Sequence, residues 1–128
     1  MSTATDIATR LAAAGLGLTA GTNLFVNDMP TTPAAAVAVF DIPSPPPIRA
    51  MHNTQISQWR RFQIQSRSNK SVDAAALCQS CLAAMESGTV TIGSSVYDVI
   101  LADGSAALLK RDENGLVTFY AEGRAAIR

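Results

Sequence analysis

The feature that most restricts how this chain can fold is a cluster of prolines in its first half. Pro43, Pro45, Pro46 and Pro47 lie within five consecutive positions. Proline lacks a backbone N–H and fixes φ, so this stretch can form neither a helix nor an inner strand of a sheet. Residues 41–53 are therefore expected to form an exposed, semi-stiff loop of polyproline character.

Two segments beside this loop have the residue patterns of β-strands. Residues 34–40 read AAAVAVF and are apolar on both faces, which predicts a central strand covered on both sides. Residues 57–67 alternate, and Phe62 and Ile64 share one face. The other face carries Arg61, Gln63, Gln65 and Arg67. This second segment is therefore predicted to be a half-buried strand with one polar face.

Two segments have helical spacing of their apolar residues. In residues 3–14, Thr3 followed by Asp6 resembles a capping box at the start of a helix. Residues 71–87 have the same periodicity, and Ser71 is the expected N-cap. We expect one helix in each segment.

The remaining segments read as short strands separated by turn residues. Such strands are expected at residues 23–26, 89–92, 96–102, 107–111, 116–121 and 125–128. Asn114-Gly115 is a strong tight-turn signal, because both residues tolerate positive φ. The order of elements predicts an α+β fold, in which an antiparallel or mixed sheet packs against two helices. The 128 residues suit a single domain.

Charge and hydropathy limit the classes of partner. Ten Lys and Arg residues balance ten Asp and Glu residues, so net charge gives no attraction to nucleic acid or to anionic membranes. No apolar run approaches the ~20 residues of a membrane span, and no basic leader precedes an apolar stretch. We therefore expect neither a membrane partner nor a secretory signal, and the two cysteines suit a reducing cytoplasm.

The residues that could carry chemistry do not form a catalytic or metal-binding pattern. Cys78 and Cys81 form a C-x-x-C pair in the middle of a predicted helix, away from the helix N-terminus that would lower a thiol pKa. A zinc site needs about four ligands, and His52 is the only histidine. We interpret the cysteines as buried apolar residues and His52 as a surface or loop residue. No enzyme activity, metal or cofactor is expected.

One cluster combines basic and aromatic residues. It contains Trp59, Arg60, Arg61, Phe62, Arg67 and Lys70. Such a cluster can bind single-stranded nucleic acid, but it can also be a solvated strand face or a protein interface. The neutral chain favours the last two interpretations. In a weaker form of the nucleic-acid interpretation, the arginines line a channel that DNA traverses without specific readout.

The order of several short motifs is similar to that of a known family. The first is NLFVNDMPTTP at residues 23–33, followed by the apolar strand 34–40. FQIQSR at residues 62–67 and the helix at 73–85 come next. YDVI at 97–100 and RDENG at 111–115 precede a final strand that ends near 124–128. Together they resemble the bacteriophage minor capsid protein family, whose members are read as tail terminators or tail completion proteins of long-tailed phages.

This resemblance implies a structural role in the virion, at the junction of tail and neck, after assembly in the host cytoplasm. Members form a homo-oligomeric ring, usually a hexamer, that stops polymerisation of the major tail tube protein and docks to head–tail connector or neck proteins. Viral double-stranded DNA passes non-specifically through the lumen.

Two sets of residues are the candidate assembly sites. The polar strand face is expected to meet the lumen or a neighbouring subunit through Arg61, Gln63, Gln65 and Arg67. The proline loop is either a mobile connection or an assembly arm formed by Pro43, Pro45, Pro46 and Pro47.

Three alternative functions remain open at this stage. The first is another neck component, such as a head-completion or stopper protein. The second, of a different class, is a small nucleic-acid-binding module that uses residues 59–70. The third is a hydrolase, which the absence of a nucleophile–base pattern makes a poor fit.

Overall fold

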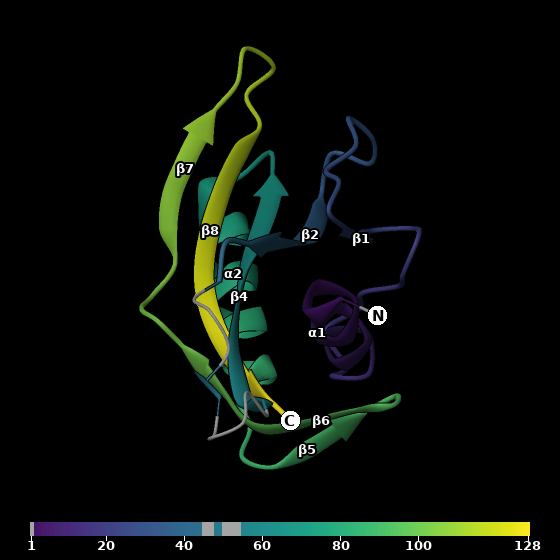
Figure 1. Ribbon diagram of the computed structural model, residues 1–128. Coiled ribbons are helices and arrows are strands. Elements are labelled where there is room, and N and C mark those ends of the chain that lie inside the picture. Colours follow the sequence, from purple (N-terminus) through teal and green to yellow (C-terminus); the bar gives the residue numbers. More distant parts are fainter. Residues whose placement is uncertain (1, 45–47, 50–54) are drawn as a thin grey trace.

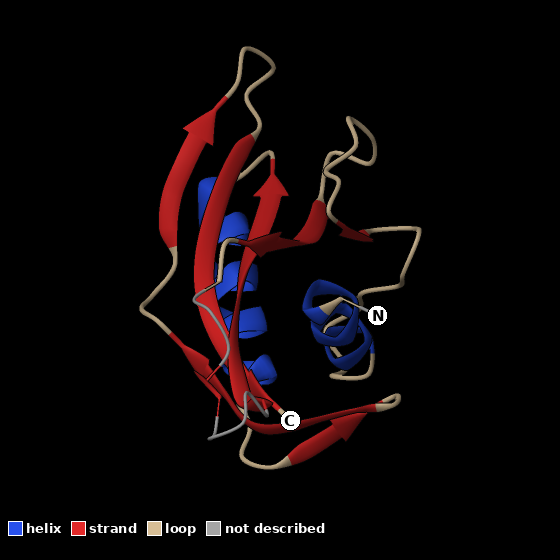
Figure 2. Cartoon of the chain, in the orientation of Figure 1, coloured by secondary structure: helices blue, strands red, loops and turns tan. Residues whose placement is uncertain are grey.

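The computed structural model describes residues 2–44, 48–49 and 55–128, and shows a curled sheet with two helices (Figures 1 and 2). This is the α+β class that the sequence predicts. The elements in chain order are α1 (Thr3–Ala12), β1 (Leu24–Val26), β2 (Ala36–Ile42), β3 (Ile48–Arg49), β4 (Gln55–Ser68), α2 (Ser71–Met85), β5 (Val90–Ile92), β6 (Ser95–Ala102), β7 (Ala107–Arg111) and β8 (Val117–Ile127).

The sheet is mixed, and two long strands form its centre. Its order is β1-β2-β4-β8-β6-β5, with β3 paired to β4 and β7 paired to β8. Only the β1–β2 pair is parallel among the described strands, and the others are antiparallel. β4 and β8 pair along almost their whole length, from Gln58↔Ile127 to Ser68↔Val117. Every other strand except β1 and β5 pairs directly with one of these two.

Both helices contribute to one hydrophobic core on the inner face of the sheet. α2 packs along β4 and β8, while α1 packs on β1 and β2 and touches α2. Figure 1 shows α1 between the β1–β2 end and the β5–β6 end of the curled sheet. Phe62 and Ile64 of β4 are fully buried in this core, as the alternation in the sequence predicts. The opposite face of β4 and β8 is not covered by either described helix.

The start of α1 differs from the predicted capping box. Ser2 is the N-cap, and its side chain accepts a hydrogen bond from the Thr5 N–H at 3.2 Å. Thr3 and Asp6 are instead buried against the core. A second acceptor for the helix comes from β2, because Asp41 Oδ1 accepts from the Ala4 N–H at 3.0 Å. The start of α1 is therefore stabilised by its local cap and by a tertiary contact that local sequence does not reveal.

Several element boundaries also differ from the sequence-based expectation. α1 ends at Ala12, and α2 begins at Ser71 with Lys70 as N-cap, so Ser71 is not the cap. The two C-terminal strands expected at 116–121 and 125–128 are a single strand, β8. The loop expected at residues 41–53 contains the end of β2 and the short strand β3. Pro45, Pro46, Pro47 and His52 lie outside the described residues.

The β4–β8 pair requires a glycine at one position. Gly123 lies opposite Phe62, and the Phe62 ring fills the space where a side chain would stand. A Cβ atom on Gly123 would come within 2.5 Å of Phe62 Cζ and 2.8 Å of the Leu101 carbonyl oxygen. The ring could rotate or shift, but the carbonyl belongs to the β6 backbone. Only glycine therefore permits this close approach of ring and strand.

We expect Gly123→Ala to lower the free energy of unfolding by about 1–3 kcal/mol, because the methyl group overpacks the core. Denaturant unfolding measures this change. The control is Gly104→Ala, since nothing lies within 4 Å of a Cβ there. The control is expected to change stability by about 0.5 kcal/mol or less. Equal stability of the two variants would contradict the described packing.

Candidate assembly surface

The side of β4 and β8 that faces away from the helices carries a connected polar network. We call it the outer sheet face, and its central residues are Trp59, Arg61, Gln63, Gln65, Tyr120, Glu122 and Arg124. The strand alternation that buries Phe62 and Ile64 directs these residues outward. Antiparallel register places the β4 and β8 members of this face directly beside one another, such as Arg61 beside Arg124 and Gln63 beside Glu122.

Glu122 connects two of the predicted site residues. Arg61 Nη2 lies 3.5 Å from Glu122 Oε1, and Gln63 Nε2 donates to Glu122 Oε2 at 3.5 Å. Gln65 Nε2 in turn donates to Gln63 Oε1 at 2.7 Å. The structure thus brings Arg61, Gln63 and Gln65 together. Glu122 joins these three residues in one network. Its position beside them follows from the β4–β8 register, which the sequence does not specify.

Arg124 forms a second part of the face. Its guanidinium stacks over the Trp59 ring at 4.9 Å from the ring centroid, and its Nε lies 3.2 Å from Asp103 Oδ1. Arg61 and Arg124 are adjacent in register and would repel each other if unpaired. Each has its own carboxylate partner, so the face is nearly charge-balanced. Exposed pairs of this kind contribute only about 0–1 kcal/mol to stability.

Arg67, which was predicted to share this face, is instead a buried internal clamp. Only 8% of the residue is exposed. Its guanidinium donates to the carbonyl oxygens of Ala34 at 3.0 Å, Pro33 at 2.8 Å and Pro30 at 2.5 Å. The strand directs Arg67 to the predicted side, but the chain before β2 folds over it. The expectation that Arg67 presents its charge to a lumen or to a neighbour is therefore corrected.

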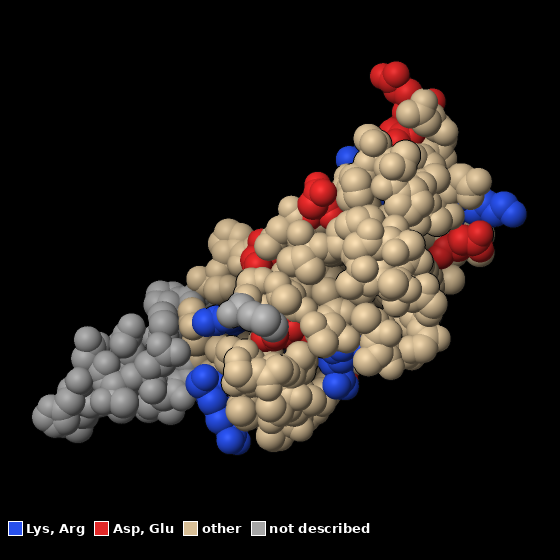
Figure 3. All heavy atoms as spheres, turned by 90° about the vertical axis from the view of Figure 1, so that its right-hand side faces the viewer, with Lys and Arg blue, Asp and Glu red and all other residues tan. Residues whose placement is uncertain are grey.

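The basic residues at positions 60–70 do not form one patch. Arg60 is partly buried and donates from Nε to Gln58 Oε1 at 3.4 Å, on the side opposite Arg61. Lys70 lies beyond the end of β4, where α2 begins. On the side of the molecule that carries α1, Figure 3 shows Lys and Arg residues scattered among uncharged and acidic residues. These described side chains therefore do not form the continuous basic groove that single-strand binding proteins use.

The cysteines are packed as the sequence interpretation expects. Cys78 and Cys81 are fully buried in the core. Burial raises the pKa of Cys78 to about 11, and burial followed by the neighbouring Cys78 raises the pKa of Cys81 to about 12. Thiols with such pKa values stay protonated at neutral pH and are poor nucleophiles. Among the described residues, no group of three or more His, Cys, Asp or Glu residues could hold a metal.

A buried carboxylate, Asp6, was not anticipated from the sequence. Tyr97 Oη donates to Asp6 Oδ2 at 2.5 Å, which connects α1 to β6 inside the core. Burial, together with the hydrogen bond to Asp6, raises the pKa of Tyr97 to about 12. The two residues are 91 positions apart, so no local pattern signals the pair. Its position in the core indicates a structural role.

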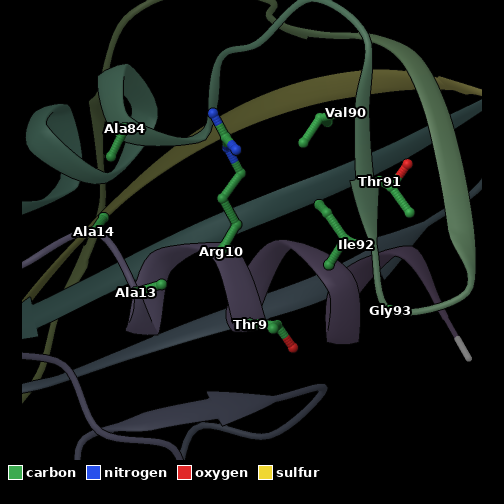
Figure 4. A pocket seen from close by; sticks show the side chains of 9 residues that line it. All are labelled: Thr9, Arg10, Ala13, Ala14, Ala84, Val90, Thr91, Ile92 and Gly93. Atoms are coloured by element: carbon green, nitrogen blue, oxygen red, sulfur yellow. The ribbon is translucent and has the colours of Figure 1, made fainter.

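A groove of about 420 Å³ lies between α1, the end of α2 and strand β5 with the turn that follows it (Figure 4). Arg10 crosses it and donates to the carbonyl oxygens of Met85 and Glu86, both at 3.2 Å. These are orphan carbonyls at the C-terminus of α2, which has no basic residue in its last turn. The other lining residues are small or apolar, and none is a carboxylate, histidine or cysteine. The groove therefore lacks a catalytic set.

Comparison with known proteins decides the family. Residues 10–122 match the sequence family described as "Bacteriophage tail terminator protein". The chain belongs to this family. The resemblance seen in the sequence motifs is confirmed, and the family is one of structural proteins. The terminator-family chain is thus a virion-associated structural protein of the phage tail.

The fold of this terminator-family chain is shared with a solved virion component. A chain of the structure titled "Virion of native gene transfer agent (GTA) particle" superposes with a TM-score of 0.59 and 16% sequence identity. The similarity covers 91% of the terminator-family chain and 83% of that chain. No curated protein sequence matches the terminator-family chain. Neither of its described helices has the length and hydrophobicity to cross a membrane.

The different environments of Arg67 and Arg61 give a test of the clamp. We expect Arg67→Ala to lower the free energy of unfolding by about 1–3 kcal/mol, because three carbonyl oxygens lose their donor. Arg61→Ala is the control and is expected to cost about 1 kcal/mol or less, since its ion pair is exposed. Denaturant unfolding of both variants measures the difference. Equal stability of the two would show that Arg67 does not act as a clamp.

Proposed function

We propose that this chain ends the growth of the tail tube. In this proposal, copies of it form a ring, most simply a hexamer, on the head-proximal end of the tube. The ring stops addition of the major tail tube protein and offers its other side to head–tail connector or neck proteins. The observation that carries the proposal is the match to the tail terminator family over residues 10–122.

The composition of the outer sheet face supports a position of this face beside the DNA channel. Its partly exposed residues are mainly amides and paired charges, centred on Gln63, Gln65 and the Arg61–Glu122 pair. Such a face can lie against duplex DNA without the strong phosphate binding that unpaired arginines would give. We propose that it faces the lumen and that viral double-stranded DNA passes it without specific readout.

The two ends of the subunit support contacts with two different partners. Figure 1 shows the β7–β8 turn and the connection between β1 and β2 at one end, and the β5–β6 turn with the C-terminus at the other. Loops can diverge without disturbing the core, so they suit partner-specific contacts. A terminator needs two such faces, because tube and neck differ.

The proline loop remains a proposed assembly arm. Its beginning is fixed to the sheet, because Ser44 Oγ accepts a hydrogen bond from the Arg61 N–H at 2.9 Å. A chain already restricted by proline loses little conformational entropy when it binds a partner. We propose that Pro43, Pro45, Pro46 and Pro47 contact a neighbouring virion protein.

The head-completion or stopper role is the alternative within the same class. It shares the structural character of the family, and it differs in where the protein acts. The nucleic-acid-binding module fits less well, because Arg61, Arg67 and Arg124 are occupied by partners within the chain.

Tail length tests the proposal. We expect that a phage lacking this gene makes overlong tails that are not joined to heads, because nothing stops tube polymerisation. Electron microscopy of lysates measures tail length, and the same phage with the gene restored is the control. Tails of normal length beside emptied or unjoined heads would contradict the terminator role and favour the stopper alternative.

A further inference from the structure

The exposed apolar residues of the subunit are concentrated on two strands at opposite edges of the sheet. Among the described residues, four large hydrophobic side chains are exposed. Leu108 and Leu109, on β7, are 48% and 41% exposed, and Val26, on β1, is 36% exposed. The fourth is Val72, at the beginning of α2. Exposed leucines and valines on edge strands mark places where another chain can bind.

β7 has the features of a binding edge. All five of its residues are exposed, and within the described residues it pairs only with β8. A register shift between Leu108 and Lys110 leaves Leu109 without a partner on β8. Such a bulge hinders a continuous ladder with another strand. Contact with a partner would therefore depend mainly on the two leucine side chains.

β1 is the complementary edge. Among the named strands of the described chain it pairs only with β2, and its first residue, Leu24, also forms an isolated bridge with Ala20. Figure 1 shows β1 on the opposite side of the curled sheet from β7. The charged side chains within β7 are basic, and the charged residue that follows β1 is acidic. Two acidic residues, Asp112 and Glu113, follow β7, and Asp112 Oδ1 accepts hydrogen bonds from the N–H groups of Asn114 and Leu116 in the turn. Lys110 and Arg111 end β7, whereas Asp28 follows β1, and none of the three forms an ion pair among the described residues.

We propose that the β7 edge of one subunit packs against the β1 edge of the next, with Leu108 and Leu109 covering Val26. This contact is heterologous, because two different surfaces meet, and repetition of it around an axis closes a ring. This proposal rests on the ring proposed above, and it names the strands that would form the contact between neighbouring subunits. A contact of a five-residue strand with a three-residue strand is small, so closure of the ring or the tube as template is needed to hold it.

Incorporation into particles is the first test. Leu109→Lys places a charge in the contact, and we expect it to reduce the amount of this protein in purified particles at least about tenfold. Val72→Lys is the matched control, since it changes a more exposed residue outside the contact. Thermal unfolding of the isolated variants checks that both fold. Wild-type incorporation of Leu109→Lys, or equal loss of Val72→Lys, would overturn the proposal.

Disulfide trapping shows whether the partner is a second copy. β1 and β7 are separated by four strand spacings, or about 19 Å, which exceeds the ~7 Å Cα separation that a disulfide can bridge. A bond between Val26→Cys and Leu109→Cys must therefore join two chains. We expect mild oxidation of particles carrying both substitutions to give a ladder of covalent multimers that disappears on reduction.

The natural cysteines do not interfere, because Cys78 and Cys81 are fully buried. Val72→Cys with Leu109→Cys is the control pair and is expected to stay monomeric. Particles that contain the first pair but show no ladder would overturn the proposal, as would an equal ladder from the control pair. Overlong tails in the gene deletion would uphold the terminator role in either case, so the two proposals can fail separately.

Discussion

The pairing of β4 with β8 is the interaction on which the rest of this structure depends. Eleven register pairs join the two strands, and β2, β3, β6 and β7 are all built onto their outer edges. The inner side of the pair presents Phe62 and Ile64 to both helices, and Gly123 leaves room for the Phe62 ring. Strand alternation then directs the polar network around Glu122 outward. One register thus sets both the core and the candidate assembly surface.

Polar contacts between distant segments position the first third of the chain on this framework. Asp41 accepts from the Ala4 N–H and from Asn27 Nδ2, which joins α1, β1 and β2. The Arg67 clamp fixes the chain that leads into β2. Arg67 is itself buried, and hydrogen bonds of a buried charged group are costly to leave unmade, so the clamp specifies one path for this segment. The hydrogen bonds of Asp41 also fix the position of β1 relative to α1 and β2.

The sequence predicts the class and most elements of this fold, because periodicity reports which face of an element is buried. The alternation at residues 57–67 correctly separates Phe62 and Ile64 from Arg61, Gln63 and Gln65. Periodicity does not report which distant strand lies alongside, so the role of Glu122 and the burial of Asp6 could not be foreseen. Arg67 illustrates the same limit of periodicity. It lies on the polar face of the strand, but a segment more than thirty positions earlier in the chain covers it.

Together these features support the proposal that the curled sheet lines the DNA channel at the end of the tail tube with the polar face that neither described helix covers. Electron cryomicroscopy of the head–tail junction in intact particles tests that claim most directly. The account predicts a ring of this chain between tube and neck, with Gln63, Gln65 and Glu122 toward the channel. A ring whose outer sheet face is buried against another protein, or a position of the chain away from this junction, would contradict it.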